Sequence, residues 1–124
     1  MKILIADDEP DLELLIRQRF RKQIRDKQYE FIFAHDSTEA LEKLDQDPEI
    51  TLILSDINMP GMDGLTFTRE IRQDPALAKL PVILLTGDRS EDTRQKGREA
   101  GASDFIEKPI KGGELQAMVK KFIG

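Results

Sequence analysis

The sequence predicts an α/β fold, a doubly wound (βα)5 domain on a five-stranded parallel sheet with the strand order 2-1-3-4-5. Three observations lead to this prediction. Short apolar segments alternate five times with segments of helical periodicity. The apolar segments are hydrophobic at nearly every position, as strands are when helices cover both faces of a sheet. The length of 124 residues suits one domain with its own core, and we expect a single domain over residues 1–124.

Each predicted strand is short, and capping residues mark the start of several predicted helices. The strands are expected at 2–6, 29–34, 50–54, 80–85 and 104–107, with Asp56 at the carboxyl end of the third. Asp36, with Glu39 three residues later, predicts a capping box, and Ser90 is expected to cap the fourth helix. That helix has almost no apolar stripe, and Gly97 inside it costs up to about 1 kcal/mol. We therefore expect it to have low local stability.

The first predicted helix begins at Pro10 and presents one apolar face as far as Ile24. Its other face carries a basic run made of Arg17, Arg19, Arg21, Lys22 and Arg25. Such a run is either a solvated helix face or a docking surface for an acidic partner.

The composition excludes several classes of function. The chain has no cysteine, which rules out disulfides, thiol catalysis and cysteine-ligated metals. The net charge of −5 argues against non-specific nucleic-acid binding, and we expect no direct nucleic-acid contact. No apolar run approaches the roughly 18–20 residues that span a membrane, and the amino terminus is not a signal peptide. We expect a cytoplasmic domain without membrane contact, in which the single histidine, His35, is structural or inert.

Polar side chains follow four of the five predicted strands at their carboxyl ends. Asp7-Asp8 follow the first strand, and Asp56 ends the third, ahead of a Pro60-Gly61 turn. Thr86 ends the fourth strand and Lys108 follows the fifth. In a parallel sheet these ends lie on one edge, where ligands bind. Taken singly, Asp56 is equally well explained as a turn cap, and Lys108 as an ion-pair partner without a catalytic role.

Three carboxylates at one place repel each other, so they need a cation or raised pKa values. With oxygen ligands alone, the expected cation is a hard ion such as Mg²⁺. Lys108 and Thr86 would then supply a positive charge and a hydrogen bond to a transferred phosphoryl group. Asp56 is the expected nucleophile, which attacks phosphorus in line and becomes an aspartyl phosphate.

With these residues the chain resembles the receiver domain of two-component response regulators, and its size is similar to the single-domain chemotaxis type. The resemblance covers essentially the whole chain. Its motifs are Asp7-Asp8, Asp56 within Ser-Asp-Ile-Asn-Met-Pro-Gly-Met-Asp-Gly, Thr86, Ala100-Gly101-Ala102 and Lys108-Pro109. It implies a flavodoxin-like fold and a phosphorylation-activated signalling switch. Such a switch catalyses only its own phosphorylation and dephosphorylation, and is not otherwise an enzyme.

The resemblance also implies a role for each site residue. Asp56 would be the phosphoacceptor, and Lys108 and Thr86 would assist the transfer. Mg²⁺ (or Mn²⁺) would bind Asp7, Asp8, Asp56 and the backbone carbonyl of Asn58. Thr86 and Phe105 would form the switch pair, and Lys108-Pro109 would be a cis peptide.

The resemblance further implies partners. A phosphohistidine on a sensor histidine kinase or phosphotransfer protein would donate the phosphoryl group. The surface of the fourth helix, fifth strand and fifth helix would control a downstream effector protein or an attached effector domain. Arg94 and Arg98 are expected to join a partner contact or a phosphorylation-dependent dimer there, against the alternative of a solvated face. Asn58 and Asp88 are expected to modulate hydrolysis of the phosphoryl group by guiding water.

Some residues depart from the family pattern. Phe105 stands where tyrosine is frequent, so any output contact must be apolar packing. Gly87 stands where alanine is frequent. Met118 replaces an arginine that the winged-helix DNA-binding subfamily uses in dimer salt bridges, which argues against that dimer. The polar character of the fourth helix is a further departure.

Two other classes of function remain as alternatives. A phosphatase of the haloacid-dehalogenase type also uses an aspartate after a buried strand, but it has a second acid where this chain has Asn58. A docking domain that works without phosphorylation fits poorly, because no member of the acceptor set is missing. The end of the chain at Phe122-Ile123-Gly124 also suits a receiver cut from a longer protein.

Overall fold

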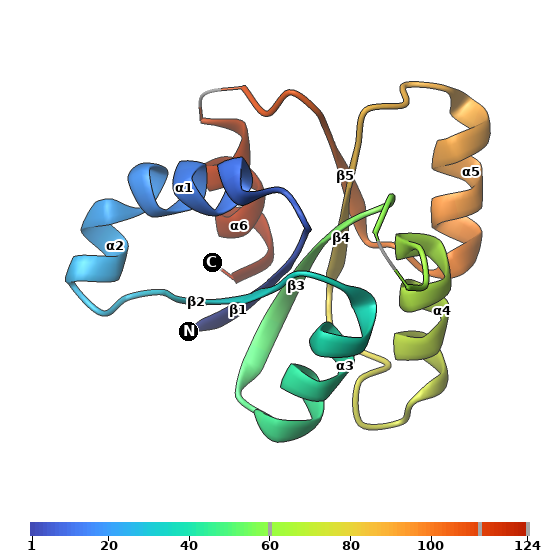
Figure 1. Cartoon of the computed structure of the whole chain (residues 1–124), viewed down its shortest axis with the longest axis horizontal. Coiled ribbons are helices and arrows are strands. Elements are labelled where there is room, and N and C mark those ends of the chain that lie inside the picture. Colours follow the sequence, from blue (N-terminus) through green and yellow to red (C-terminus); the bar gives the residue numbers. More distant parts are fainter. Residues whose placement is uncertain (60, 112, 124) are drawn as a thin grey trace.

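The protein is described by a computed structural model that covers residues 1–59, 61–111 and 113–123. In these residues five parallel strands form one sheet (Figure 1). The strands are β1 (Lys2–Ala6), β2 (Glu30–Ala34), β3 (Ile50–Asp56), β4 (Val82–Thr86) and β5 (Asp104–Glu107). Their order in space is β2-β1-β3-β4-β5, which confirms the predicted fold class and strand order. The chain reverses its direction of winding between β1 and β3, which is where a doubly wound sheet binds its ligand.

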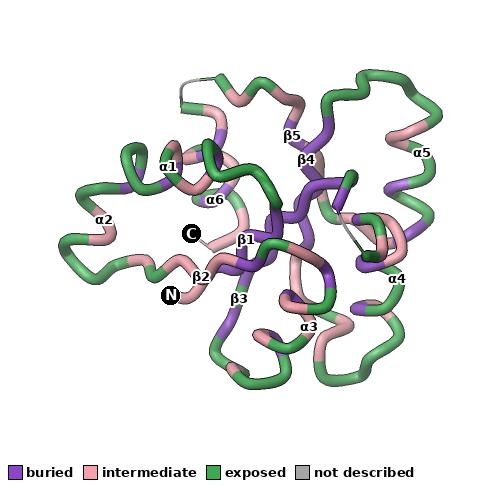
Figure 2. Tube along the Cα trace, in the orientation of Figure 1, coloured by how far each residue is buried: buried purple, intermediate pink, exposed green. Residues whose placement is uncertain are grey.

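Helices cover both faces of this sheet, with α1, α2 and α6 on one face and α3, α4 and α5 on the other (Figure 1). The described helices are α1 (Pro10–Arg19), α2 (Arg21–Arg25), α3 (Ser37–Gln46), α4 (Gly64–Gln73), α5 (Glu91–Ala100) and α6 (Glu114–Ile123). Each face has its own hydrophobic cluster, one around Ile16 and Val119 and the other around Leu44 and Phe67. The central strands are therefore buried along most of their length (Figure 2). No helix in the described ranges is long and apolar enough to cross a membrane.

The first predicted helix is two helices, which corrects the prediction of a single one. The break falls at Phe20, whose backbone has φ −109° and ψ 22°, outside the helical region. The side chain of Phe20 is 1% exposed. Its ring lies 5.8 Å from the ring of Tyr29 and 5.0 Å from that of Phe31. Burial of this ring against β2 compensates for the interrupted helix.

The predicted helix caps are present, with one difference. The Asp36 carboxylate accepts the backbone N–H of Glu39 at 2.7 Å, and the Ser90 hydroxyl accepts that of Thr93. Glu39 does not complete a capping box, because its carboxylate accepts the N–H of His35 instead. Gly101 ends α5 in the left-handed conformation, with φ 106°. Pro60 and Gly124, which belong to the predicted turn and chain end, lie outside the described residues.

Candidate functional site

The carboxyl ends of β1, β3, β4 and β5 lie on one edge of the sheet and bring the predicted site residues together. Asp56 and Thr86 are the last residues of β3 and β4, and only 4% and 2% of their surfaces are exposed. Asp7 and Lys108 directly follow β1 and β5. Parallel pairing of neighbouring strands aligns these four ends, which are far apart in the sequence.

Lys108 joins the acidic residues of this edge. Its Nζ lies 2.9 Å from Oδ2 of Asp56 and 3.0 Å from Oδ2 of Asp7. A third carboxylate oxygen, Oε1 of Glu9, lies 3.3 Å away. The ammonium group therefore connects the end of β5 to the ends of β3 and β1, as an ion-pair partner and a hydrogen-bond donor.

Asp7, Asp8 and Asp56 form an oxygen-rich cluster. One carboxylate oxygen from each residue lies within 4.8 Å of the others. Asp7 and Asp56 are buried, whereas Asp8 is exposed to solvent. A hard divalent cation that retains some of its waters suits this arrangement of two inner ligands and one outer ligand. The donor set therefore fits Mg²⁺.

The electrostatics of the cluster follow from its burial. Burial raises the pKa of Asp7 above the ordinary value of 3.8, opposed by hydrogen bonds from the Glu9 N–H and from Lys108. Burial alone lowers the pKa of Lys108, but the carboxylates of Asp56 and Asp7 outweigh it and raise that pKa. Lys108 thus stays charged at neutral pH and compensates part of the negative charge of the cluster.

A backbone N–H and the Lys108 ammonium group hold the Asp56 carboxylate in place. Its Oδ1 accepts the N–H of Asn58 at 3.1 Å, while Oδ2 accepts from Lys108. The start of α4 packs very closely on this loop, and a Cβ atom at Gly64 would lie 2.4 Å from the backbone oxygen of Asp56. Only glycine fits there, and the Gly64 N–H donates to the carbonyl of Ile57 at 2.7 Å. The segment after β3 is thus fixed by backbone contact with α4.

Thr86 and Asp88 form a local network at the end of β4. The Thr86 hydroxyl accepts the N–H of Asp88 at 3.0 Å. Both oxygens of the Asp88 carboxylate accept hydrogen bonds, from the N–H of Ser90 at 2.8 Å and from the hydroxyl of Thr93 at 2.6 Å. These bonds lower the pKa of Asp88, that from Thr93 most. The carboxylate therefore stabilises the start of α5 in this structure.

Phe105, on β5, is half-buried against α5. A Cβ atom at Gly97 would lie 2.5 Å from Cε1 of its ring, so the absence of a side chain at Gly97 makes room for the ring. The guanidinium of Arg94 lies over the same ring, 5.5 Å from its centroid. Arg94 is held by Glu107, whose carboxylate lies 2.6 Å from Nη2 and also pairs with Arg89. Arg94 and Phe105 therefore form one packed unit.

Several contributors to the site were not predicted from the sequence. Glu9 contacts Lys108, and its place in the acidic run after β1 was the only available signal. Glu107 was expected only as a strand residue, and its pairing with Arg94 depends on the position of α5.

Arg98, expected at a partner contact, pairs within its own helix with Glu91 and Gln95. Lys108-Pro109 is a cis peptide, as the resemblance implied.

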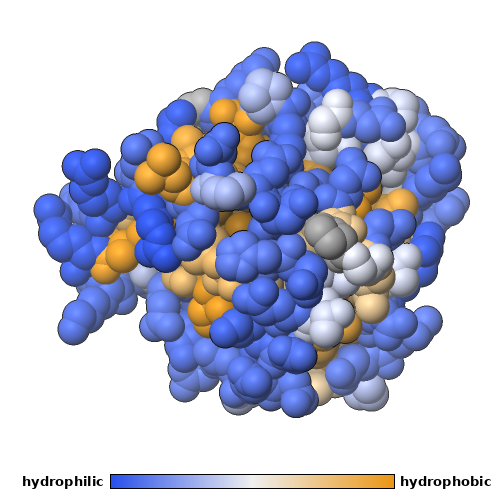
Figure 3. All heavy atoms as spheres, viewed as in Figure 1, coloured by the Kyte–Doolittle hydropathy of each residue, from blue (hydrophilic) through white to orange (hydrophobic). Residues whose placement is uncertain are grey.

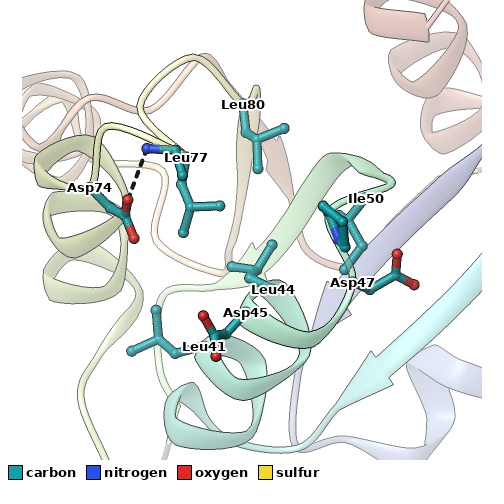
Figure 4. A pocket seen from close by; sticks show the side chains of 10 residues that line it. Leu41, Leu44, Asp45, Asp47, Ile50, Asp74, Leu77 and Leu80 are labelled. Atoms are coloured by element: carbon teal, nitrogen blue, oxygen red, sulfur yellow. Dashed lines mark hydrogen bonds between the residues drawn. The ribbon is translucent and has the colours of Figure 1, made fainter.

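A groove at the opposite ends of the strands is separate from this site (Figure 4). It has a volume of about 400 Å³ and lies at the amino ends of β3 and β4. Leucine side chains from α3 and from the segment before β4 face into it, among them Leu44 and Leu77 (Figure 4). The site residues at the carboxyl ends of the strands make no part of its lining.

Comparison with known proteins identifies the family. Residues 3–120 match the family model of the response regulator receiver domain. The chain belongs to this family. Receiver domains are phosphorylation-activated signalling switches of two-component systems, and neither the phosphatase nor the phosphorylation-independent docking domain is favoured.

Individual relatives agree with this assignment. Response regulator PleD of Caulobacter vibrioides is 39% identical over 121 residues, which are 96% of this chain and 25% of PleD. Chemotaxis response regulator CheY4 of Vibrio cholerae superimposes with a TM-score of 0.83 at 30% identity, over 98% of each chain. The receiver domain of sensor histidine kinase PA1611 from Pseudomonas aeruginosa has a TM-score of 0.84 at 29% identity. That alignment covers 99% of this chain and 97% of the PA1611 domain, which was crystallised with a magnesium ion in its active site cleft.

The chain spans about a quarter of the length of PleD, the first of these relatives. The similarity therefore concerns only the aligned quarter of PleD.

Proposed function

We propose that Asp56 accepts a phosphoryl group from a phosphohistidine and that this transfer switches the domain between two states. The observation that carries the proposal is the position of Asp56, which is buried at the end of β3 between Lys108 and the acidic cluster. An Asp56 carboxylate oxygen would attack phosphorus, and the bond from phosphorus to the histidine nitrogen would break. The histidine nitrogen leaves with that electron pair, and the new acyl phosphate remains on Asp56.

The residues around Asp56 would stabilise the charge of the transferred group. Asp7, Asp8 and Asp56 would hold Mg²⁺ or Mn²⁺ with the backbone carbonyl of Asn58. When bound, the ion supplies positive charge to the phosphoryl oxygens. Lys108 carries a second positive charge, already 2.9 Å from Asp56. The Thr86 hydroxyl would turn from the Asp88 backbone toward the phosphoryl group.

Reorientation of Thr86 would change the position of the Phe105 ring and thereby the surface formed by α5, β5 and α6. Thr86 and Glu107 are register partners in β4 and β5, and the N–H of Lys108 donates to the carbonyl of Thr86 at 2.8 Å. These contacts support a coupling from the acceptor site to the strand that carries Phe105. The downstream effector, which is a partner or an attached domain, would contact this surface through apolar packing and through Arg94 and Arg98. A phosphorylation-dependent dimer through the same surface is part of this proposal.

The proposed setting is that of a receiver domain over residues 1–124 in the cytoplasm. Its phosphodonor is a sensor histidine kinase or a phosphotransfer protein. Beyond its own phosphorylation and dephosphorylation it would catalyse no reaction. The relatives support this setting, since they are response regulators and receiver domains of histidine kinases.

The test uses a small phosphodonor in place of the kinase. Wild-type protein incubated with Mg²⁺ and acetyl phosphate should gain the mass of one phosphoryl group, and beryllofluoride should shift its amide NMR spectrum. Asp56→Asn should do neither, while remaining folded. Lys108→Ala should still take up phosphate slowly but fail to show the active-state shift. Equal phosphorylation of Asp56→Asn and wild type would overturn the proposal.

A further inference from the structure

The end of α1, α2 and the turn before β2 form an exposed basic ridge. We define the ridge by the exposed side chains of Arg17, Arg19, Arg21, Lys22, Arg25 and Lys27. Residues 17–27 hold six of the 19 Lys and Arg residues and one of the 24 Asp and Glu residues. The segment therefore has a formal charge of +5, and the remainder of the chain has −10, which gives the total of −5. The charge is strongly separated across this small domain.

Most of the ridge is not neutralised within the chain. Arg17 pairs with Glu13 at 3.0 Å, and Arg25 with the adjacent Asp26 at 3.3 Å. The other four cations have no carboxylate oxygen within 4.0 Å among the residues that the structure describes. These charges are available to an anionic partner.

A groove lined by three charged residues and by three aliphatic or aromatic residues borders the basic ridge. Its volume is about 480 Å³, and its lining includes Arg17, Ile24, Lys27, Tyr29, Glu30 and Phe31. The rings of Tyr29 and Phe31 pack edge to face, 6.3 Å apart, and both rest on the buried ring of Phe20. This packing makes the floor of the groove rigid and aromatic. On the α1–α2 side of Figure 3, hydrophobic surface shows between hydrophilic side chains.

The backbone of Lys27 is a second unusual feature of this surface. Lys27 has φ 59°, in the left-handed region, and it is the one non-glycine residue with positive φ in the described ranges. Glycine or asparagine adopts this conformation at lower cost than lysine. The turn thus carries a cation on the rim of the groove at a position that does not favour lysine.

We propose that the basic ridge and its groove bind an extended, acidic segment of a partner protein, which inserts one apolar side chain over Tyr29 and Phe31. Carboxylates of the segment pair with the ridge, which is the charge complementarity that the +5 segment offers. Among the described strands β2 lies at the edge of the sheet and pairs with β1, so an extended segment finds a strand edge beside the groove. This inference does not depend on phosphorylation of Asp56.

The same features disfavour two other anionic partners. A nucleic acid would extend beyond the basic ridge over the remainder of the chain, which has a formal charge of −10. A membrane surface needs exposed apolar side chains to enter the lipid interface. Among the described residues, the exposed large hydrophobic side chains are those of Met1 and Leu14, and neither belongs to the ridge.

The test measures anisotropy of a fluorescein-labelled peptide, Glu-Asp-Glu-Phe-Glu-Asp-Glu, with the unphosphorylated domain. Binding should be saturable, should perturb the amide NMR signals of residues 17–31, and should weaken several-fold between about 20 and 200 mM salt. Replacement of the peptide phenylalanine by glycine should weaken it further. Lys22→Glu should weaken binding about fivefold, whereas the charge-matched Lys79→Glu on the opposite side of the sheet should not.

Lys27→Gly separates binding from folding. It should reduce affinity while leaving the melting temperature unchanged or higher, because glycine suits φ 59°. Equal losses for Lys22→Glu and Lys79→Glu would overturn the proposal, as would NMR shifts outside residues 17–31. Tighter binding of a single-stranded oligonucleotide or of anionic phosphatidylserine vesicles would also overturn it.

Discussion

The ring of Phe105 on β5 fills the space that a side chain at Gly97 on α5 would need, because a Cβ atom at Gly97 would lie 2.5 Å from Cε1 of that ring. The same Cβ would lie 2.6 Å from Cζ and 3.3 Å from a methyl group of Leu84. The glycine that lowers the helix propensity of α5 is therefore what allows β5 to place an aromatic ring under that helix. The glycine lowers the intrinsic stability of the helix and in return permits close tertiary packing of the ring.

Gly97→Ala is expected to destabilise the domain. Alanine gains up to about 1 kcal/mol in helix propensity, but overpacking against a fixed ring costs about 1–3 kcal/mol. We expect a net loss of about 1 kcal/mol, measured by urea unfolding. In a Phe105→Leu background the ring is gone, so the same substitution should become neutral or stabilising. Equal effects in both backgrounds would show that the ring does not limit this position.

The raised pKa of Asp7 predicts how the stability of the fold depends on pH. Burial raises its pKa above 3.8, so the folded state binds more protons than the unfolded state between 3.8 and the raised value. The stability that this group contributes is therefore present below pH 3.8 and is lost as the pH rises through the folded pKa. Asp7→Asn cannot ionise, and it should therefore be more stable than wild type at pH 7.

Urea unfolding of Asp7→Asn and wild type, in a metal-free buffer between pH 4 and pH 7, tests this. The advantage of the variant should shrink as the pH falls toward 4. Asp11→Asn, on the exposed start of α1, serves as the control for removal of a carboxylate outside the buried cluster. If Asp7→Asn is less stable at pH 7, then the contact of Asp7 with Lys108 outweighs the cost of its burial.

The sheet and the site edge were predictable because their signals are local. Each buried strand is a short apolar run, and a polar residue at its end marks where the run stops, as with Asp56 and Thr86. Parallel topology then brings these ends together without further information. For this reason the Nζ of Lys108 lies within 3.0 Å of a carboxylate oxygen of Asp7 and of one of Asp56.

The parts that the sequence did not predict depend on contacts between distant segments. Helical periodicity continues through Phe20, but packing of its ring on Tyr29 and Phe31 breaks the helix there. The requirement for Gly64 arises from the approach of α4 to the backbone of Asp56, and no local pattern reports such an approach. Backbone contacts of this kind become visible only once the elements are placed.

Mg²⁺ binding should stabilise the fold through the acidic cluster. At ten times its dissociation constant the ion should add about 1.4 kcal/mol to the free energy of unfolding, and EDTA should reverse the effect. Asp8→Asn, which alters the exposed ligand, should lose most of this increment without unfolding the domain. Asp11→Asn removes the same charge outside the cluster and should keep the increment. Thermal unfolding with and without Mg²⁺ measures the increment in each variant. Equal increments in the two variants would contradict the assigned ligand set.

Asp88 offers a prediction about the lifetime of the phosphorylated state. Its carboxylate is held by Ser90 and Thr93 in this structure, so it must exchange one of these bonds before it can orient an attacking water. We expect Asp88→Ala to slow dephosphorylation about two- to tenfold, less than the roughly 10²–10⁴-fold of a full general base, because Asp88 would only orient the water.

Thr93→Ala is the informative comparison, because it keeps the Asp88 carboxylate and removes the hydroxyl that holds Oδ2. If Asp88 guides water, this variant should dephosphorylate at the wild-type rate or faster, since the carboxylate is freed. Both variants lose the same hydrogen bond at the start of α5, so a purely structural effect would change both rates in the same direction. Decay of the phosphorylated mass after removal of acetyl phosphate measures the two rates, and opposite changes identify Asp88 as the group that acts on the water.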